Sequence, residues 1–244
     1  METWGGNRQA MRCVDLPGLK AWVYSSPIDA AQGGGDVHYL SVCNYGLLSR
    51  IALADVSGHG PSAAAFSGKL HALLREHINT WDQSDLMREL NQAFREAVNG
   101  RKYATAVILG YYRATGETAF TCAGHLPPLW YRAGARRWEF LEEGRETGVH
   151  QCGLPVGLIP GTRYHQTVIR IEPGDLVALY TDGITEAENA AGEMLDRERL
   201  LDWARLAPAG SSEAAGQFLL QRLEQYRGSA LSDDETLIVL QRAA

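Results

Sequence analysis

Residues 37–56 read VHYLSVCNYGLLSRIALADV, two apolar runs on either side of a short break. β-Branched, aromatic and other apolar side chains dominate both runs, 37–43 and 47–56, as is typical of β-strands. The break at Asn44–Gly46 has the length and composition of a hairpin turn. This stretch therefore predicts an antiparallel pair of strands.

Further strand-like runs lie on both sides of this pair. They cover 20–26, 103–112, 117–124, 129–132, 137–142, 167–171, 176–182 and 236–242. Short turns join many of them, such as the Pro-Gly turn at 172–175. Because connections of hairpin length join antiparallel strands, we expect the sheets to be mainly antiparallel.

Two pairs of helices are predicted between the strand blocks. The first helix has Pro61 in its first turn, and the second has Asp82 or Ser84 as N-cap and stops at Gly100. The other pair is expected near 194–206 and 211–227. Separate blocks of strands and helices indicate an α+β fold. Because the last strand must rejoin a sheet formed earlier, we expect 1–244 to be a single domain with its core at about 20–242.

Composition excludes several classes of protein. The chain has 244 residues, 45% hydrophobic and 21% charged, so a sizeable core can form. Its net charge of −6 (29 acidic against 23 basic residues) disfavours nonspecific nucleic-acid binding. No apolar run is long enough for a membrane span, and the N-terminus has no segment of signal-peptide type.

The cysteines favour a reduced protein. Cys13, Cys43, Cys122 and Cys152 form no CxxC motif, which argues against a zinc ribbon or a dense disulfide framework and fits a reducing cytoplasm. We expect Cys43 and Cys122, which lie in strand patterns, to be buried apolar residues.

Four aspartates border apolar strands or glycines. They are Asp36, Asp55, Asp182 and Asp233. Strand ends can bring distant carboxylates together, and converging carboxylates repel one another unless cations lie between them. Oxygen ligands select Mg²⁺ or Mn²⁺, and two such ions can activate a water for attack on phosphorus. Each aspartate alone is more often a turn residue, so the residues leave the metal site and the turn interpretation both open.

The motifs around these aspartates carry a family resemblance. In order they are GGD (34–36), ADVSGHGPSAA (54–64), YATAVI (103–108), CAGHLPPLWYR (122–132), GLPVGL (153–158), EPGDLVALYTDGITEAENAAGEML (172–195) and DDETLIVL (233–240). This ordered set resembles the bacterial branch of the metal-dependent PPM (PP2C-type) protein serine/threonine phosphatases. That branch includes the sporulation phosphatase domain and the sigma-factor regulatory phosphatases.

The resemblance implies a fold and a mechanism. The fold would be two packed, mainly antiparallel sheets flanked by pairs of helices. Asp55 would bridge two Mn²⁺ or Mg²⁺ ions, with the Val56 carbonyl on one of them, and Asp36 would complete the site directly or through water. Asp182 and Asp233 would bind the ion that holds the nucleophilic water. Asp55 and Asp182 would thus serve catalysis, which hydrolyses a phosphoserine or phosphothreonine without a phosphoenzyme.

Some positions depart from the family pattern. Tyr39 stands where a second acid often follows the GGD motif, and Ser57 stands where the eukaryotic branch has a histidine proposed as general acid. His59 lies two residues further on, and both a turn role and proton transfer are open for it. The residue that binds the substrate phosphate is not assigned, since neither Arg8 nor Arg12 can be aligned.

Two neighbouring residues need separate roles. Asp233 and Asp234 are adjacent, so in a strand they point to opposite sides, and we expect only Asp233 to face the metals.

His125, in a Gly-His-Leu-Pro-Pro sequence, is expected to be a turn residue.

The resemblance also implies partners. The substrate would be a phosphorylated STAS-type anti-anti-sigma protein in the cytoplasm, with neither nucleic acid nor membrane involved. Regulation would come from a partner, from a homodimer or from a sensor domain. Two alternatives remain open at this point. One is a catalytically weak phosphatase fold that acts as an interaction module, and the other is a two-metal hydrolase of small phosphate esters.

Overall fold

The computed structural model describes residues 2–30, 32–58, 60–141, 152–228 and 231–243. Within these residues the strands form two six-stranded sheets. The first sheet has the order β1 (Glu2–Gly6), β4 (Asp36–Cys43), β5 (Leu48–Val56), β6 (Ala104–Tyr112), β7 (Glu117–Ala123) and β10 (Thr167–Arg170). The second has the order β2 (Ala10–Leu16), β3 (Leu19–Ser26), β12 (Glu235–Arg242), β11 (Leu176–Tyr180), β8 (Leu129–Arg132) and β9 (Arg137–Phe140). Neighbouring strands in both sheets pair antiparallel, as predicted.

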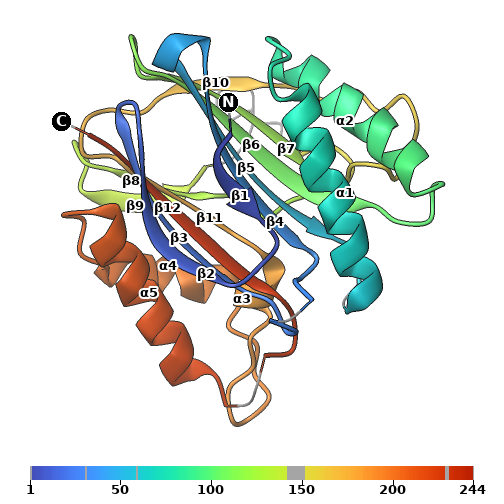
Figure 1. The fold of residues 1–244 in the computed structure, drawn as a ribbon. Coiled ribbons are helices and arrows are strands. Elements are labelled where there is room, and N and C mark those ends of the chain that lie inside the picture. Colours follow the sequence, from blue (N-terminus) through green and yellow to red (C-terminus); the bar gives the residue numbers. More distant parts are fainter. Residues whose placement is uncertain (1, 31, 59, 142–151, 229–230, 244) are drawn as a thin grey trace.

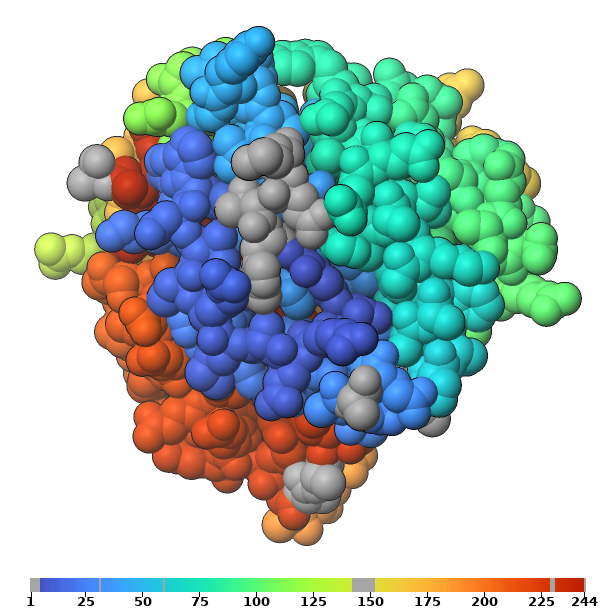
Figure 2. Space-filling view, viewed as in Figure 1, coloured from blue at the N-terminus to red at the C-terminus, as the bar shows by residue number. Residues whose placement is uncertain are grey.

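Helices cover the outer face of each sheet. α1 (Pro61–His77) and α2 (Gln83–Ala97) pack on the first sheet, and α4 (Arg197–Leu206) and α5 (Ser212–Tyr226) pack on the second (Figure 1). Figure 2 shows the first helix pair in teal and green on the right and the C-terminal helices in orange at the lower left, with blue N-terminal strands between them. The predicted pair of sheets flanked by pairs of helices is therefore confirmed.

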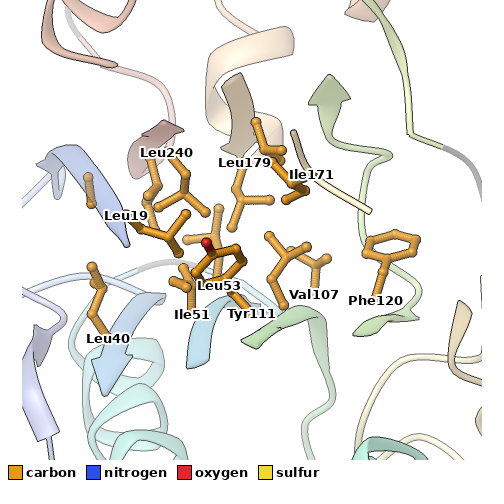
Figure 3. Packing of buried hydrophobic residues seen from close by; sticks show 14 of the residues in the cluster. Leu19, Leu40, Ile51, Leu53, Val107, Tyr111, Phe120, Ile171, Leu179 and Leu240 are labelled. Atoms are coloured by element: carbon orange, nitrogen blue, oxygen red, sulfur yellow. The ribbon is translucent and has the colours of Figure 1, made fainter. Parts of the chain in front are cut away.

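Alternation along the strands explains this layering. In β5, Ile51 and Leu53 point between the two sheets, whereas Ala52 and Ala54 point toward α1 and α2. Figure 3 shows the central layer, in which side chains such as Val107 and Leu179 meet from opposite sheets. Each fully buried Leu, Ile or Val contributes about 1.5–3 kcal/mol relative to an exposed one.

Most predicted element boundaries agree with the structure. α1 begins at Pro61, and Asp82 rather than Ser84 caps α2, because its carboxylate accepts the amide of Asp85 at 3.0 Å. The strand expected at 176–182 ends at Tyr180, since Asp182 begins the short helix α3 (Asp182–Thr185). Among the described residues, no helix is both long and apolar enough to cross a membrane.

The cysteines differ from the expectation. Cys122 is buried as predicted, but it forms a disulfide with Cys152, with the two Cα atoms 5.0 Å apart. Cys43 is half-buried and free, and Cys13 is exposed and free. The two bonded cysteines are 30 positions apart in the sequence, so no local motif marks the pair.

Candidate metal centre

Four aspartates lie at one edge of the sandwich, where strands of both sheets end. Asp36 begins β4, Asp55 is the penultimate residue of β5, and the two are directly opposite each other in the strand register. Asp182 follows β11, and Asp233 precedes β12, the neighbour of β11. The Thr181 hydroxyl donates to Asp36 Oδ2 at 2.8 Å and therefore links the two sheets at this edge.

The charges of these groups act on one another. Burial first, and then the nearby charges of Asp182, Asp233, Asp234 and Glu186, together raise the pKa of Asp55 to about 7. The pKa of Asp36 lies well above its ordinary value because of burial and then because of Asp55. Burial and Asp233 raise the pKa of Asp182. The site therefore concentrates negative charge that cations would relieve.

Val56 contributes its backbone to the same place. A Cβ on Gly35 would lie 3.0 Å from the Val56 carbonyl oxygen and 3.4 Å from Asp55 Oδ1. Because Gly35 has no side chain, it leaves an open space, here called the cradle, which is bordered by the Val56 carbonyl and the Asp55 carboxylate. An all-oxygen, anionic donor set of this kind suits Mg²⁺ or Mn²⁺.

The described residues do not form a closed ligand set as they stand. No group of three or more of their His, Cys, Asp and Glu side chains could hold a metal ion in the observed arrangement.

Asp233 and Asp234 have different surroundings. Asp234 is buried, and its two oxygens accept the amides of Ile28 at 2.7 Å and Gly35 at 2.6 Å. Asp233 is half-buried, and its Oδ1 accepts the Asp234 amide at 2.8 Å. Asp234 thus fastens the segment that leads into Asp36, which leaves Asp233 as the less engaged carboxylate of the pair.

Tyr39 does not take the place of a ligand in this structure. It lies three residues after Asp36 and therefore on the opposite face of β4, where it is buried among the side chains beneath α1. Its ring contacts that of His71 with centroids 5.7 Å apart.

His125 lies in the connection between β7 and β8, where a turn residue was predicted, and it also contacts a neighbouring strand. Its side chain is buried, its Nδ1 lies 2.7 Å from the Thr105 hydroxyl, and burial lowers its pKa to about 4. Thr105 is directly opposite Asp55 in the register of β5 and β6. His125 therefore supports the strand next to the acidic cluster. His59 lies outside the described residues.

Two residues near the cluster were not predicted. Glu186 follows Asp182 by four positions, and burial, Asp182 and Asp233 raise its pKa. The i, i+4 spacing within TDGITE could have indicated it. Lys102 donates to the Ser57 carbonyl at 2.7 Å and places a cation beside the loop that follows Asp55, and no sequence pattern marks it.

This architecture, with carboxylates at the edge between two packed sheets, is that of the PP2C-type phosphatase domains. The family model described as Stage II sporulation protein E (SpoIIE) matches residues 48–243, and the chain therefore belongs to this family.

Individual relatives agree with this assignment. RsbU of Bacillus subtilis, named a phosphoserine phosphatase, is 27% identical over 218 residues, covering 88% of this chain and 61% of RsbU. The crystal structure of the RsbU and RsbW domains of a Mycobacterium tuberculosis protein superposes with a TM-score of 0.77 at 26% identity, covering 96% of this chain and 63% of that chain. The structure of the PP2C phosphatase domain of SpoIIE from Bacillus subtilis, with part of its regulatory domain, has a TM-score of 0.76 at 16% identity, covering 93% and 64% respectively. This chain spans 61% of RsbU and 39% of a second curated relative, IcfG of Synechocystis, so it corresponds to only part of each.

Proposed function

We propose that this chain hydrolyses phosphoserine or phosphothreonine on a protein substrate with the help of Mn²⁺ or Mg²⁺. The observation that carries the proposal is the meeting of Asp36, Asp55, Asp182 and Asp233 from both sheets at one edge. Membership of the SpoIIE family supports it, as does the name of the relative RsbU. We further propose that residues 1–244 act as one catalytic unit.

Each residue has a proposed role. Asp55, the most central of the acids, would bridge two ions, and the Val56 carbonyl would face one of them across the cradle left by Gly35. Asp182 and Asp233 would hold the second ion, and Asp36, fixed by Thr181, would complete the site directly or through water. When bound, the ions would neutralise the carboxylates and lower the pKa of a water, which would supply hydroxide for attack on phosphorus at neutral pH.

The substrate we propose is a phosphorylated STAS-type regulator, with control by a regulatory partner or a second copy of the chain. The support is the resemblance of the motifs to sigma-factor regulatory phosphatases. In the similar Mycobacterium tuberculosis structure an RsbU domain occurs together with an RsbW domain.

The test is phosphate release from a phosphoserine protein in Mn²⁺. We expect EDTA to abolish release and Asp182→Asn to lower kcat by at least about 100-fold, because one metal ligand is lost. Asp202→Asn is the matched control, since Asp202 is exposed and pairs with Arg205 on α4. Full activity in EDTA or in Asp182→Asn would overturn the proposal. Turnover of nucleotides but of no phosphoprotein would favour a small-ester hydrolase instead.

A further inference from the structure

The segment 152–156 is attached to the first sheet at the same edge as the aspartates. The disulfide joins Cys152 to Cys122 in β7, and the Gly153 amide donates to the Cys122 carbonyl at 3.0 Å. Val156 and Ala104 exchange two backbone hydrogen bonds, of 2.8 and 2.7 Å. The fit is close, since a Cβ on Gly124 would lie 2.5 Å from the Pro155 ring.

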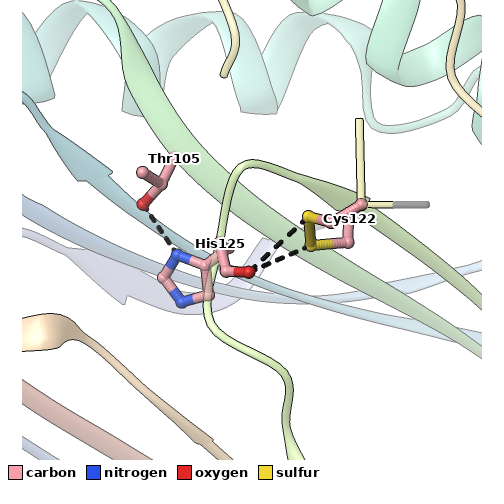
Figure 4. The surroundings of a disulfide bond; sticks show 4 residues. Thr105, Cys122 and His125 are labelled. Atoms are coloured by element: carbon pink, nitrogen blue, oxygen red, sulfur yellow. Dashed lines mark hydrogen bonds between the residues drawn. A yellow bond between two sulfur atoms is a disulfide. The ribbon is translucent and has the colours of Figure 1, made fainter. Parts of the chain in front are cut away.

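Short contacts lead from the disulfide to Asp55. The carbonyl oxygen of His125 lies 3.2 Å from Cys122 Sγ and 3.6 Å from Cys152 Sγ (Figure 4). The ring of the same histidine contacts Thr105, which is directly opposite Asp55. Ala104, the partner of Val156, is opposite Val56. The disulfide therefore contacts His125. This histidine supports β6, the strand that lies opposite Asp55 and Val56, two of the proposed metal-binding positions.

The two sulfurs differ in accessibility. Cys122 is 4% exposed, whereas Cys152 is an exposed residue that borders a groove of about 400 Å³. Arg163 and His165 also line this groove. The Arg163 charge beside an exposed disulfide favours the approach of a thiolate to Cys152, and exposed disulfides are the ones that exchange readily.

We propose that Cys122–Cys152 is a thiol–disulfide exchange site whose redox state sets the metal affinity of the acidic cluster. The metal readout rests on the proposed function, whereas the exchange itself does not. The co-reactant is a dithiol. Its thiolate attacks Cys152 Sγ, the S–S bond breaks, and Cys122 leaves as a thiolate that takes up a proton. The second thiol of the dithiol then attacks the mixed disulfide, which releases and protonates Cys152, so that the dithiol is oxidised to a disulfide and the protein gains two thiols.

Reduction removes the covalent crosslink, so that only backbone hydrogen bonds hold the segment 152–156 to Cys122 and Ala104. These hydrogen bonds should then open more often, and the strand carrying Ala104 and Thr105 is held less firmly opposite Val56 and Asp55. Changes to the groups that orient metal ligands typically alter affinity by 10–100-fold. We therefore expect the reduced protein to bind Mn²⁺ about tenfold more weakly than the oxidised protein.

The experiment compares oxidised protein with protein reduced by dithiothreitol and then desalted without oxygen. Thiol titration should find two thiols (Cys13 and Cys43) before reduction and four after it. Mn²⁺ affinity is measured by calorimetry in both states. Cys152→Ser should bind Mn²⁺ as weakly as the reduced protein, and dithiothreitol should not change its affinity. Cys13→Ser/Cys43→Ser should keep the full difference in Mn²⁺ affinity between the oxidised and reduced states.

Hydrogen exchange gives a second readout that needs no metal. The amides of Ala104 and Val156 should exchange faster after reduction, with the amides of α5 unchanged. Four thiols in the air-oxidised protein, or equal Mn²⁺ affinity and equal exchange in both redox states, would overturn the inference and leave the proposed function intact. If neither redox state binds Mn²⁺ but the amide exchange rates differ, the proposed function and the effect on metal affinity are overturned. The effect of the disulfide on the strand that carries Ala104 and Thr105 is then still supported.

Discussion

Gly183 allows two of the acidic segments to approach each other. A Cβ at this position would overlap the backbone carbonyl of Asp234 and lie 3.5 Å from Asp233 Cβ. Gly34 likewise allows the Asp234 carboxylate to approach the backbone closely, since a Cβ on Gly34 would lie 2.6 Å from that carboxylate. The distance between Asp182 and Asp233 therefore depends on a residue without a side chain.

Gly183→Ala should separate these segments. We expect a loss of about 1–3 kcal/mol in the free energy of unfolding, because a methyl group must enter filled space. Mn²⁺ affinity should fall as well, since Asp182 and Asp233 move apart. Urea unfolding in EDTA and Mn²⁺ calorimetry measure the two effects. Gly210→Ala is the control, as its Cβ would meet nothing within 4 Å. Equal free energies of unfolding and equal Mn²⁺ affinities in the two variants would contradict the close approach of Gly183 to Asp233 and Asp234.

Single residues could be predicted only in part. The four aspartates stand out in the sequence because each borders a glycine or an apolar strand, and the pairing of Asp36 with Asp55 follows once β4 and β5 form a hairpin. The burial of Asp234 and the position of His125 could not be predicted in the same way. Both depend on contacts with segments about 200 and 20 positions away, respectively, which no local pattern encodes.

At the scale of elements, α2 depends on its first residue. The Asp82 carboxylate accepts the Asp85 amide at 3.0 Å, whereas Ser84 lies inside the helix. Asp82→Ala should therefore lower the free energy of unfolding by about 1 kcal/mol, and Ser84→Ala should leave it unchanged or slightly raised. Thermal unfolding of both variants measures the difference. A larger loss in Ser84→Ala than in Asp82→Ala would show that the cap is misplaced.

Elements with a clear hydrophobic pattern were predictable, and the others were not. Runs such as β5 and β12 are nearly continuous in apolar residues because both of their faces are covered. β2 was missed, since most of its side chains are exposed and its sequence AMRCVDL shows little alternation. α3 was missed because four residues are too few for a periodicity.

The whole molecule is held together by pairing between distant parts of the chain. β12 lies between β3 and β11, with Arg242 opposite Leu19 (Figure 1). Hydrophobic periodicity predicts each strand but not its neighbours, so the strand order of the two sheets could be anticipated only through the family resemblance. This order brings the acids of both sheets to one edge.

The charge of that edge makes stability depend on pH. The pKa of Asp55 is raised from an ordinary value of 3.8 to about 7 in the ion-free protein. Between about pH 4 and pH 7, the folded state therefore binds more protons at Asp55 than the unfolded state does. As a result, the contribution of Asp55 to the free energy of unfolding falls as the pH rises through that window. Divalent ions would replace the protons, so their binding should weaken at low pH.

Calorimetric titration with Mn²⁺ tests the central claim, that these carboxylates form a divalent-metal centre. At pH 7.5 we expect the oxidised protein to bind two ions per chain, with weaker binding at pH 5.5 because protons compete for Asp55. Asp55→Asn should bind neither ion tightly, since the bridging carboxylate is lost. Absence of Mn²⁺ binding at pH 7.5, or equal binding by Asp55→Asn, would contradict the claim.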